Sequence, residues 1–469
     1  MNELLPFKMR HIHFIAIGGI GMSGIAELMH NLGYTIQGSD IVENANVKRL
    51  KQFGIKTFIG HDAANVENAQ VVVYSSAIKE DNPELLKAKE LRIPIVHRAE
   101  MLAELMRLKW SIAIGGTHGK TTTTSMVATL LDEAKLDPTV INGGIIKAYG
   151  SNTKKGEGAW LVAEADESDC SFLKFPSTIT VVTNIDEDHM EHYNSIQDIE
   201  DAFYHFAMNT PFYGFSVMCT DDEKVQSLVS KITTRKIITY GFNRQAEVRA
   251  VNIRKMDGYV LYDAEIASKD LKINDIRLNV FGDHNILNSL VMVSIGVYLD
   301  IDGEIIKSAI NKFESVQRRY TKTGEIDNIT IIDDYAHHPS EIKAVLKATR
   351  DSNENANIIA VFQPHRYTRV KALLDRFSTC FNDADTVIVS DIYAASEKPI
   401  EGIDRIAIVD SIKAHGHRKV LHLSDPNILH EVIRKEIKDK NQEYKIICMG
   451  AGTITSWAQN LPSKLKEIM

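Results

Sequence analysis

No stretch of the 469-residue sequence approaches the ~20 consecutive apolar residues that are needed to span a lipid bilayer. The N-terminus also lacks the apolar core and cleavage site of a signal peptide, so we expect a cytoplasmic protein with no membrane partner. The net charge of -8 and the lack of any basic run longer than a pair such as Arg318-Arg319 argue against a protein that binds nucleic acids through bulk charge.

Cysteine is scarce as well. The sequence has only Cys170, Cys219, Cys380 and Cys448, which are widely spaced and form no Cys-x-x-Cys pair. We therefore expect isolated reduced thiols, as is usual in cytosolic proteins.

The sequence does contain a regular alternation of apolar, strand-like segments with helical segments. This pattern predicts an α/β fold in which parallel sheets are covered by helices. Because the chain is too long for one typical core, we place domain boundaries near Leu108 and Arg318. The expected domains are residues 1–108, 109–318 and 319–469.

A glycine loop connects a predicted strand at residues 110–114 to a predicted helix at residues 122–133. In such a loop, backbone N–H groups turn inward around phosphate oxygens, and the helix N-terminus adds partial positive charge. Lys120 would neutralise the β- and γ-phosphates of ATP, and the Thr121 hydroxyl would be a magnesium ligand. The match to the strict phosphate-loop pattern is partial, because Ile114 stands where that pattern has glycine. The flanking strand and helix nevertheless favour an ATP site over a plain surface turn. The loop residues predicted to bind ATP are Gly116, Thr117, His118, Gly119, Lys120, Thr121 and Thr122.

Acidic residues follow two further predicted strands of the central domain. Ligands of an open parallel sheet bind beyond the C-terminal ends of its strands, and carboxylates are ligands that magnesium prefers. The sequence therefore predicts a magnesium site, although spacing alone leaves a solvated acidic rim open as the alternative. Histidine is an unusual magnesium ligand, so His189 would bind through water or hold a second divalent ion. The two clusters are Glu164, Asp166, Glu167 and Asp169, and Asn184, Asp186, Asp188 and His189.

A second glycine-rich segment lies between a predicted strand at residues 11–17 and a predicted helix at residues 25–31. Gly19, Gly21 and Gly24 fit the pattern G-x-G-x-x-G. By itself this pattern would suggest NAD, but a UDP-sugar suits it equally, because such a segment binds many pyrophosphates. The segment therefore predicts a diphosphate more firmly than it predicts a cofactor.

Two loop-helix junctions of the third domain carry polar residues. One contains His337 and His338, and the other contains Arg366 and Arg369, which are three residues apart and would share a face at a helix start. Two arginines at such a junction suit a carboxylate, which accepts paired hydrogen bonds. We therefore expect a binding site here rather than a surface ion pair.

In this order, the motifs resemble the Mur ligases of bacterial cell-wall synthesis over essentially the whole chain. That family uses the shorter loop pattern G-T-x-G-K-T, so Ile114 is no departure from it. The motifs that carry the resemblance are the Gly19 segment with Ser39-Asp40, residues 116–122, 164–169, 184–189 and 282–288, Arg318-Arg319, and residues 334–339 and 362–369.

The resemblance implies Rossmann-like first and third domains and a central domain like that of P-loop ATPases, with a mostly parallel sheet. It implies ATP and Mg²⁺, or Mn²⁺ in its place, and an amide-forming reaction through an acyl phosphate. The implied residues for the UDP-sugar and amino-acid substrates are Gly19, Gly21, Gly24, Ser39, Asp40, His61, Ser75, Tyr335, His337, Arg366 and Arg369. Beyond the loop itself, the implied ATP residues are His284, Asn285, Asn288, Arg319 and Asp334. The implied metal residues are Thr121, Glu164 and His189, and the implied catalytic residues are Lys120, His337, Arg366 and Arg369.

Within the family, the resemblance favours the member that joins L-alanine to UDP-N-acetylmuramate in peptidoglycan precursor synthesis. Ligases that add later residues carry a carbamylated lysine after the Asp-His motif, whereas this chain has no lysine between Lys174 and Lys224. His337 is the candidate base for the amine, and we expect a monomer or weak homodimer. The alternative within the family adds a whole tripeptide to the same UDP-sugar. Alternatives from other classes are an NAD-dependent oxidoreductase, which leaves residues 116–122 unexplained, and a P-loop switch ATPase without a small acceptor.

Overall fold

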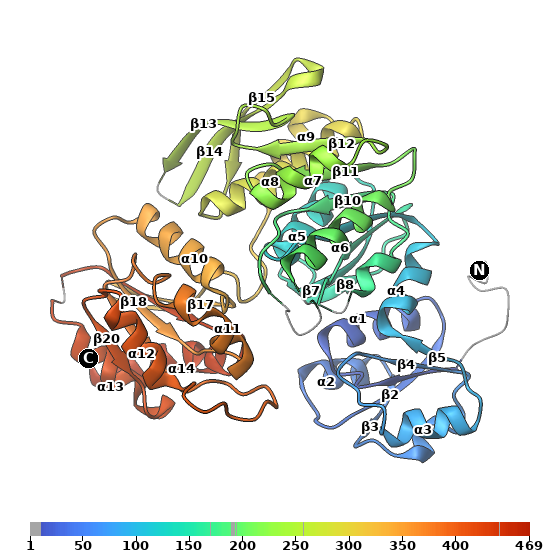
Figure 1. Cartoon of the computed structure of the whole chain (residues 1–469), viewed down its shortest axis with the longest axis horizontal. Helices are drawn as coiled ribbons and strands as arrows, with labels where there is room; N and C mark the ends of the chain where they lie inside the picture. Colours follow the sequence, from blue (N-terminus) through green and yellow to red (C-terminus); the bar gives the residue numbers. More distant parts are fainter. Residues whose placement is uncertain (1–10, 169, 189–192, 194, 257, 440) are drawn as a thin grey trace. The chain divides into compact units, whose positions relative to one another are not determined.

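The computed structural model describes residues 11–168, 170–188, 193, 195–256, 258–439 and 441–469, and Figure 1 labels its helices and strands. Asp169 and His189, two residues of the predicted acidic clusters, lie outside these described residues. The described chain forms three mostly parallel sheets covered by helices, which confirms the predicted three-domain α/β fold. The boundaries near Leu108 and Arg318 remain predictions.

By its internal contacts, the chain divides into two compact units. The first extends through Asn252 and includes Tyr262–Arg277 and Leu287–Glu314. The second contains Ile253–Leu261, Leu278–Ile286 and Ser315–Met469. The first unit therefore contains both the first sheet and the phosphate loop.

Five parallel strands form the first sheet. They are β1 (His11–Ile15), β2 (Thr35–Asp40), β3 (Lys56–Ile59), β4 (Val71–Tyr74) and β5 (Ile95–His97), in the order β3-β2-β1-β4-β5. The helices are α1 (Ile20–Asn31), α2 (Ala45–Gln52), η1 (Ala63–Val66), α3 (Pro83–Glu90) and α4 (Arg98–Met106). Phe14 packs in one core with α1, α2 and α4, whereas Ile15 packs in another with η1 and α3. Apolar residues on both faces of β1 are typical of a parallel strand covered on both sides.

Ten strands form the second sheet, in the order β15-β14-β13-β12-β11-β10-β6-β9-β7-β8. They are β6 (Trp110–Gly115), β7 (Thr139–Ile146), β8 (Ser151–Lys154), β9 (Trp160–Glu164), β10 (Ile179–Val182), β11 (Phe215–Cys219), β12 (Ile237–Gly241), β13 (Val248–Met256), β14 (Tyr259–Ile266) and β15 (Leu271–Leu278). The helices are α5 (Lys120–Glu133), η2 (Ser171–Lys174), α6 (Ile196–Met208), α7 (Glu223–Lys231), η3 (Ala267–Lys269), α8 (Asp283–Tyr298) and α9 (Gly303–Lys312).

The order of this sheet brings the predicted motifs to one edge. Strand β6 lies between β9 and β10, and both neighbours run parallel to it. The phosphate loop follows β6, and the two acidic clusters follow β9 and β10. Since parallel strands end at the same edge of a sheet, the loop and the described residues of both clusters share that edge.

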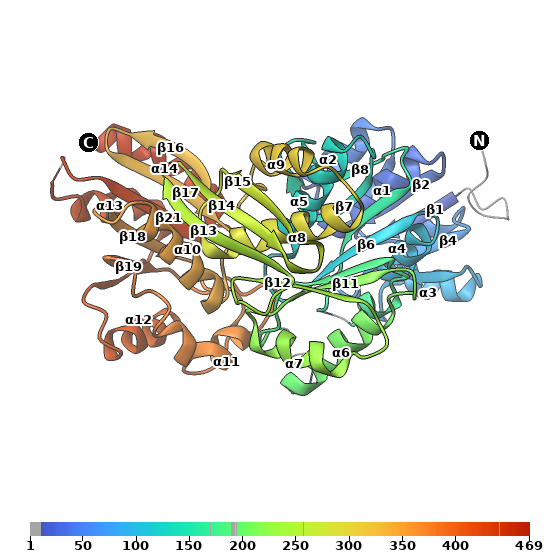
Figure 2. The same cartoon turned by 90° about the horizontal axis from the view of Figure 1, so that it is seen from above.

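Six strands form the third sheet, in the order β16-β17-β21-β18-β19-β20, with β16 antiparallel to β17. They are β16 (Thr321–Ile326), β17 (Ile329–Asp334), β18 (Asn357–Phe362), β19 (Thr386–Val389), β20 (Val420–His422) and β21 (Tyr444–Met449). The helices are α10 (Pro339–Ser352), α11 (Tyr367–Phe377), α12 (Arg405–Ala414), η4 (Pro426–Ile428), α13 (Leu429–Glu436) and α14 (Ile454–Ile468). Helices α10, α11 and α12 pack in one core and α13 and α14 in another, on opposite faces of this sheet (Figure 2).

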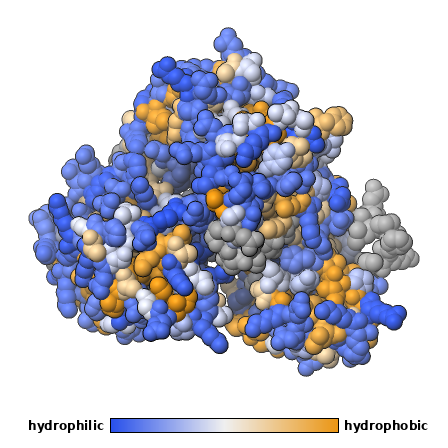
Figure 3. Space-filling model, in the orientation of Figure 1, coloured by the Kyte–Doolittle hydropathy of each residue, from blue (hydrophilic) through white to orange (hydrophobic). Residues whose placement is uncertain are grey.

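The face drawn in Figure 3 is mostly hydrophilic, with hydrophobic residues scattered between hydrophilic ones. Among the described residues, no helix combines the length and the apolar character that crossing a bilayer requires.

Candidate active site

The loop after β6 has the backbone shape of a phosphate-binding loop. Gly116 and Gly119 have φ angles of 123° and 83°, which L side chains rarely adopt. A Cβ atom on Gly116 would lie 2.0 Å from the Thr183 hydroxyl oxygen, so only glycine fits there. Helix α5 begins at Lys120 rather than at Thr122 as expected, because the loop closes directly onto the helix with Gly119 as its N-cap.

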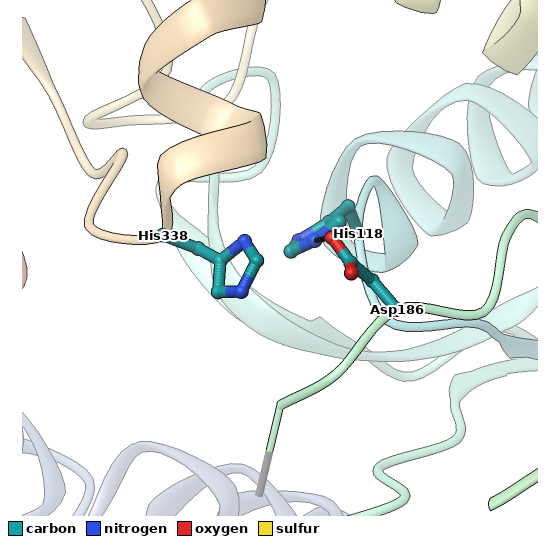
Figure 4. A group of neighbouring side chains, drawn as sticks. All are labelled: His118, Asp186 and His338. Atoms are coloured by element: carbon teal, nitrogen blue, oxygen red, sulfur yellow. Dashed lines mark hydrogen bonds and ion pairs between the residues drawn. The ribbon is translucent and has the colours of Figure 1, made fainter. Parts of the chain in front are cut away.

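The residues that follow β10 hold this loop in place. The His118 N–H donates to the Asn184 side-chain oxygen at 2.8 Å, and the Asn184 amide donates back to the His118 carbonyl at 3.0 Å. The Thr183 hydroxyl donates to the same carbonyl at 2.7 Å. The ring of His118 lies beside the Asp186 carboxylate, with 3.2 Å between Nε2 and Oδ2 (Figure 4). Asn184 and Asp186 thus contact the loop, and their predicted place near the metal remains a prediction.

Lys120 is turned back onto its own loop. Its ammonium nitrogen donates to the carbonyls of Gly116 and Thr117 at 2.8 and 3.0 Å, and it lies 2.7 Å from a carboxylate oxygen of Glu167. Burial disfavours the ammonium, but the carboxylates of Glu167, Asp166 and Glu164 outweigh that effect and raise the pKa of Lys120. Lys120 is therefore positively charged at the mouth of the loop.

Glu164 and Thr121 lie side by side at the start of α5. The Thr121 hydroxyl donates to Glu164 Oε2 at 2.9 Å, and the Gly143 N–H donates to the same oxygen at 2.8 Å. A hydroxyl and a carboxylate next to a phosphate loop are hard oxygen ligands of the kind that magnesium takes, so these two residues fit the predicted metal. The third predicted metal residue, His189, lies outside the described residues.

Asn288, from α8, reaches the same loop. A Cβ atom on Gly119 would lie 2.9 Å from the Asn288 side-chain oxygen, so the two residues are in close contact.

Thr122 is buried in the first turn of α5, whereas Thr121 is half-exposed. Of the two threonines, Thr121 is therefore the more accessible to a bound nucleotide.

The first glycine-rich segment is shorter than the sequence suggested. Helix α1 begins at Ile20 rather than at Ile25, so Gly21 and Gly24 lie in the helix and only Gly18 and Gly19 form the turn. Inside the helix, Gly24 packs tightly against a neighbouring strand. A Cβ atom on Gly24 would lie 2.5 Å from a methyl carbon of Thr153 on β8.

The predicted nucleotide residues Ser39, Asp40 and His61 surround the end of β2. The Asp40 carboxylate accepts the Gly18 N–H at 2.9 Å and so closes the glycine turn. The Ser39 hydroxyl lies 2.9 Å from Nδ1 of His61. Ser75 lies in the turn directly after the neighbouring parallel strand β4 and is half-buried. The structure thus brings these four predicted residues to one end of the first sheet.

Sequence reasoning missed Glu84, the fully buried carboxylate that orders this group. The Ser39 hydroxyl donates to Glu84 Oε2 at 2.6 Å, and His13 Nε2 and His61 Nδ1 lie 3.4 and 3.3 Å from the same oxygen. The Asn65 amide donates to Oε1 at 2.6 Å. Burial alone would raise the pKa of Glu84, but the hydrogen bonds from His13, Ser39 and Asn65 lower it. No signal in the sequence marked this glutamate, because it lies in an ordinary helical segment far along the chain from Ser39.

In the second unit, Asp334 is buried at the end of β17. Its carboxylate accepts the N–H groups of Tyr320 and Ala336, each at 2.7 Å. Burial raises the pKa of Asp334 to about 6, against the lowering effect of Arg319 and these two hydrogen bonds. Arg319 also lies 3.6 Å from Glu341 Oε1 at the start of α10.

His284 and Asn285 lie at the start of α8 in the same unit. Burial and the nearby charge of Arg319 lower the pKa of His284 to about 4, so its ring is neutral at neutral pH. The Asn285 amide donates to the Phe281 carbonyl at 2.7 Å and is thereby fixed at the helix start.

Tyr335 and His337 follow Asp334 in the loop before α10. The guanidinium groups of Arg318 and Arg319 lie 4.6 and 5.3 Å from the centre of the Tyr335 ring. The His337 ring packs edge-on against Tyr335, and its Nδ1 donates to the Tyr335 carbonyl at 2.9 Å. That bond puts the proton on Nδ1 and makes Nε2 the basic nitrogen of the neutral ring.

Arg366 is the N-cap of α11 and has unusual backbone angles. Its φ of 65° and ψ of 132° lie outside the regions that L residues favour, and such strain clusters at functional sites. Arg369 follows in the first turn of the same helix, as the sequence predicted. His365 belongs to the motif of residues 362–369 but had been given no role, and it stacks on Tyr393 at 5.5 Å between ring centres. Burial and the charges of Arg369 and Arg366 lower the pKa of His365 to about 4.

Family models match nearly the whole chain. Residues 11–110 match the model described as Mur ligase family, catalytic domain, and residues 114–296 match the Mur ligase middle domain. Residues 318–452 match the model described as Mur ligase, glutamate ligase domain.

Individual relatives are similar over the same length. The UDP-N-acetylmuramate–L-alanine ligase of Bradyrhizobium diazoefficiens is 54% identical over 470 residues, which is 99% of either chain. The crystal structure of UDP-N-acetylmuramate–alanine ligase from Thermotoga maritima has a TM-score of 0.82 at 30% identity and covers 98% of this chain and 100% of that one. A murein peptide ligase from Psychrobacter arcticus shares the fold, with a TM-score of 0.70 at 20% identity over 98% of this chain and 99% of that one. The chain belongs to the Mur ligase family.

Proposed function

We propose that this protein joins L-alanine to the carboxylate of UDP-N-acetylmuramate and cleaves ATP to ADP and phosphate, in the synthesis of the peptidoglycan precursor. The observation that carries the proposal is Lys120, held charged at the start of α5 beside the Thr121–Glu164 pair. The similarity over full length to a relative named for this reaction supports the choice of substrates.

The first step is the transfer of the ATP γ-phosphate to the sugar carboxylate. A free carboxylate is a poor acyl donor because its leaving group would be oxide, whereas an acyl phosphate has phosphate as its leaving group. The loop N–H groups and the N-terminus of α5 bind the phosphates, and Lys120 neutralises the charge that moves during transfer. Thr121 and Glu164 would hold magnesium, which when bound neutralises phosphate charge and orients the γ-phosphate.

The UDP-sugar is proposed to bind at the end of the first sheet. The turn at Gly18 and Gly19 receives the diphosphate, and Ser39, His61 and Ser75 face the rest of the nucleotide. Glu84 holds Ser39 and His61 in fixed orientations, since both lie within hydrogen-bonding reach of one carboxylate oxygen. Gly24 serves the packing of α1 instead of the diphosphate.

The second step is attack of the alanine amine on the acyl carbon. Arg366 and Arg369 bind the carboxylate of L-alanine, because two guanidinium groups at a helix start suit paired hydrogen bonds. The amine must be unprotonated to attack, and Nε2 of His337 accepts the proton. The tetrahedral intermediate then collapses to the amide and phosphate. Five further residues are assigned to the adenosine and phosphates of ATP, namely His284, Asn285, Asn288, Arg319 and Asp334.

ADP release tests the proposal directly. Purified protein is incubated with ATP, magnesium and UDP-N-acetylmuramate, and L-alanine is added to one reaction and the tripeptide to another. Release that needs both the sugar nucleotide and L-alanine is the expected result. Release that needs the tripeptide would assign the chain to the peptide-recycling ligases, and release without either acceptor would favour a switch ATPase.

Cytoplasmic location is proposed with this activity, because ATP is made there.

A further inference from the structure

A continuous series of hydrogen bonds connects the first glycine turn to the phosphate loop, and Asn152 lies at its centre. Asn152 is fully buried on β8. Its side-chain amide donates to the Ile20 carbonyl, the first residue of α1, at 2.7 Å and lies 3.4 Å from the Asn142 carbonyl on β7. Its side-chain oxygen accepts from Arg49 at 3.1 Å. One side chain thus joins the first glycine turn to the central sheet.

The series continues from Asn142 into the phosphate loop. The Asn142 amide donates to the Ser125 hydroxyl at 2.8 Å, and that hydroxyl donates to the Thr121 carbonyl at 2.9 Å. The next residue, Gly143, donates its N–H to the Glu164 oxygen that also accepts the Thr121 hydroxyl. Strand β7 therefore contacts Glu164 directly and reaches Thr121 through Ser125, and Glu164 and Thr121 are the two residues that are proposed to hold magnesium.

The packing around Asn152 allows little adjustment. A Cβ atom on Gly24 of α1 would lie 2.8 Å from the Asn152 amide nitrogen, so α1 lies directly on β8. Arg49 also donates to Ser151 at 2.6 Å and pairs with the buried Glu27 at 3.3 Å. Close contact and the hydrogen bonds made by Arg49 and Asn152 give this interface one preferred register.

We propose that Asn152 is a positioning residue of the ligation reaction, which fixes the glycine turn of the first domain relative to the phosphate loop of the second. The inference rests on the proposed function, in which the sugar diphosphate binds at the turn and ATP binds at the loop. The sugar carboxylate can attack the γ-phosphate only if both substrates are held at the right separation, and a misplacement of about 1 Å can cost ~10²-fold in rate. Asparagine suits this position because it donates to Ile20 and accepts from Arg49 at once.

Asn152→Ala tests this role through separate measurements of binding and turnover. We expect kcat to fall about 10- to 100-fold, as misplaced reactants predict, while the Kd of UDP alone and the Kd of ADP alone stay within about threefold. Trapping the acyl phosphate with hydroxylamine should show the same slowing, because the defect precedes amine attack. Lys174→Ala is the matched control. It removes another contact between the first domain and the central domain, the 2.5 Å ion pair of Lys174 on η2 with Glu100 on α4, which involves neither loop. Its kcat should not change.

Two results would overturn the inference. One is an Asn152→Ala enzyme with unchanged kcat, and the other is a loss of kcat that only parallels weaker binding and a lower Tm, as a purely structural role predicts.

Hydrogen exchange tests the same connection without turnover. UDP alone should slow amide exchange in residues 120–125 of the unaltered protein, and this effect should be lost in Asn152→Ala. If UDP changes nothing there in the unaltered protein, the inference fails even if ligation is observed. If UDP has the expected effect but the unaltered protein does not use L-alanine with UDP-N-acetylmuramate, the proposed function fails and the connection through Asn152 stands.

Discussion

The ammonium nitrogen of Lys120 lies 2.7 Å from a carboxylate oxygen of Glu167, and their side chains are only 12% and 3% exposed. A bound γ-phosphate would therefore compete with Glu167 for this lysine. The pairing keeps Lys120 charged in a buried position while the loop holds no phosphate, because the carboxylate offsets the cost of burying the ammonium.

Glu167→Gln should make Lys120 easier to deprotonate. Burial lowers the pKa of Lys120, and nearby carboxylates raise it. Without the Glu167 charge, fewer carboxylates offset the effect of burial, so this pKa falls. The alkaline limb of the pH profile of kcat/KM for ATP should then move to lower pH, since that ratio reports the free enzyme. Steady-state rates between about pH 7 and pH 11 measure the position of this limb. The control is Glu157→Gln, which changes an exposed glutamate. An unmoved limb in Glu167→Gln would show that the pair does not set the charge of Lys120.

Lys120→Ala should abolish measurable ADP formation. Removing one preorganised group that stabilises transition-state charge costs about 10²–10³-fold, and Lys120 also binds the ground-state phosphates. ADP release in a coupled assay with UDP-N-acetylmuramate and L-alanine measures the effect. Lys174→Ala, far along the chain in an exposed pair, should be as active as the unaltered enzyme. Normal turnover by Lys120→Ala would refute the assignment of the phosphate loop.

Glu84→Gln should destabilise the first domain in a pH-dependent way. The pKa of Glu84 is lowered on folding, so its ionised form stabilises the fold above the ordinary value of 4.5, and this stabilisation is lost as the pH falls through the lowered folded-state pKa. At pH 7 we expect the free energy of unfolding to drop by about 1–3 kcal/mol, because buried partners lose a charged acceptor. Urea unfolding at several pH values should show the difference narrowing below pH 4.5.

The control for this substitution lies on the same helix. Glu90 of α3 is exposed and pairs with Lys87 at 2.9 Å, so Glu90→Gln should change stability little at any pH. If Glu84→Gln instead lowered the free energy of unfolding equally at every pH, the buried partners would need the shape of the Glu84 side chain and not its charge.

Arg366→Ala should weaken the use of L-alanine and leave ATP binding unchanged. A charge-assisted hydrogen bond contributes ~1.5–3 kcal/mol, so KM for L-alanine should rise about 10- to 100-fold. Arg376→Ala is the control, because Arg376 lies on the same helix and donates to Ser340 at 2.8 Å. Equal effects of Arg366→Ala on KM for ATP and for L-alanine would argue against a specific amino-acid site at this helix.

Local chemistry explains what could be predicted from the sequence. The phosphate loop is contiguous, so its strand, glycines, lysine and helix stand in one short run, and the run predicts the backbone shape. The strand predicted at residues 110–114 corresponds to β6 (Trp110–Gly115), because a parallel strand buried on both faces is apolar along its length. The start of α1 at Ile20 was missed because glycines normally favour a loop, whereas the close contact with Thr153 requires a glycine at position 24 inside the helix.

Contacts between distant residues were decided by the tertiary structure alone. Glu84 reaches Ser39 across 45 residues, and Asn152 reaches Ile20 across 132. Neither residue belongs to a periodic pattern or a motif, because a hydrogen bond depends on where the folded chain brings two groups together and not on their spacing. The sequence by itself determined the family, the fold class and the ATP loop. The folded chain decided which buried polar groups orient that loop and the nucleotide residues, since their partners meet only once the sheets have formed.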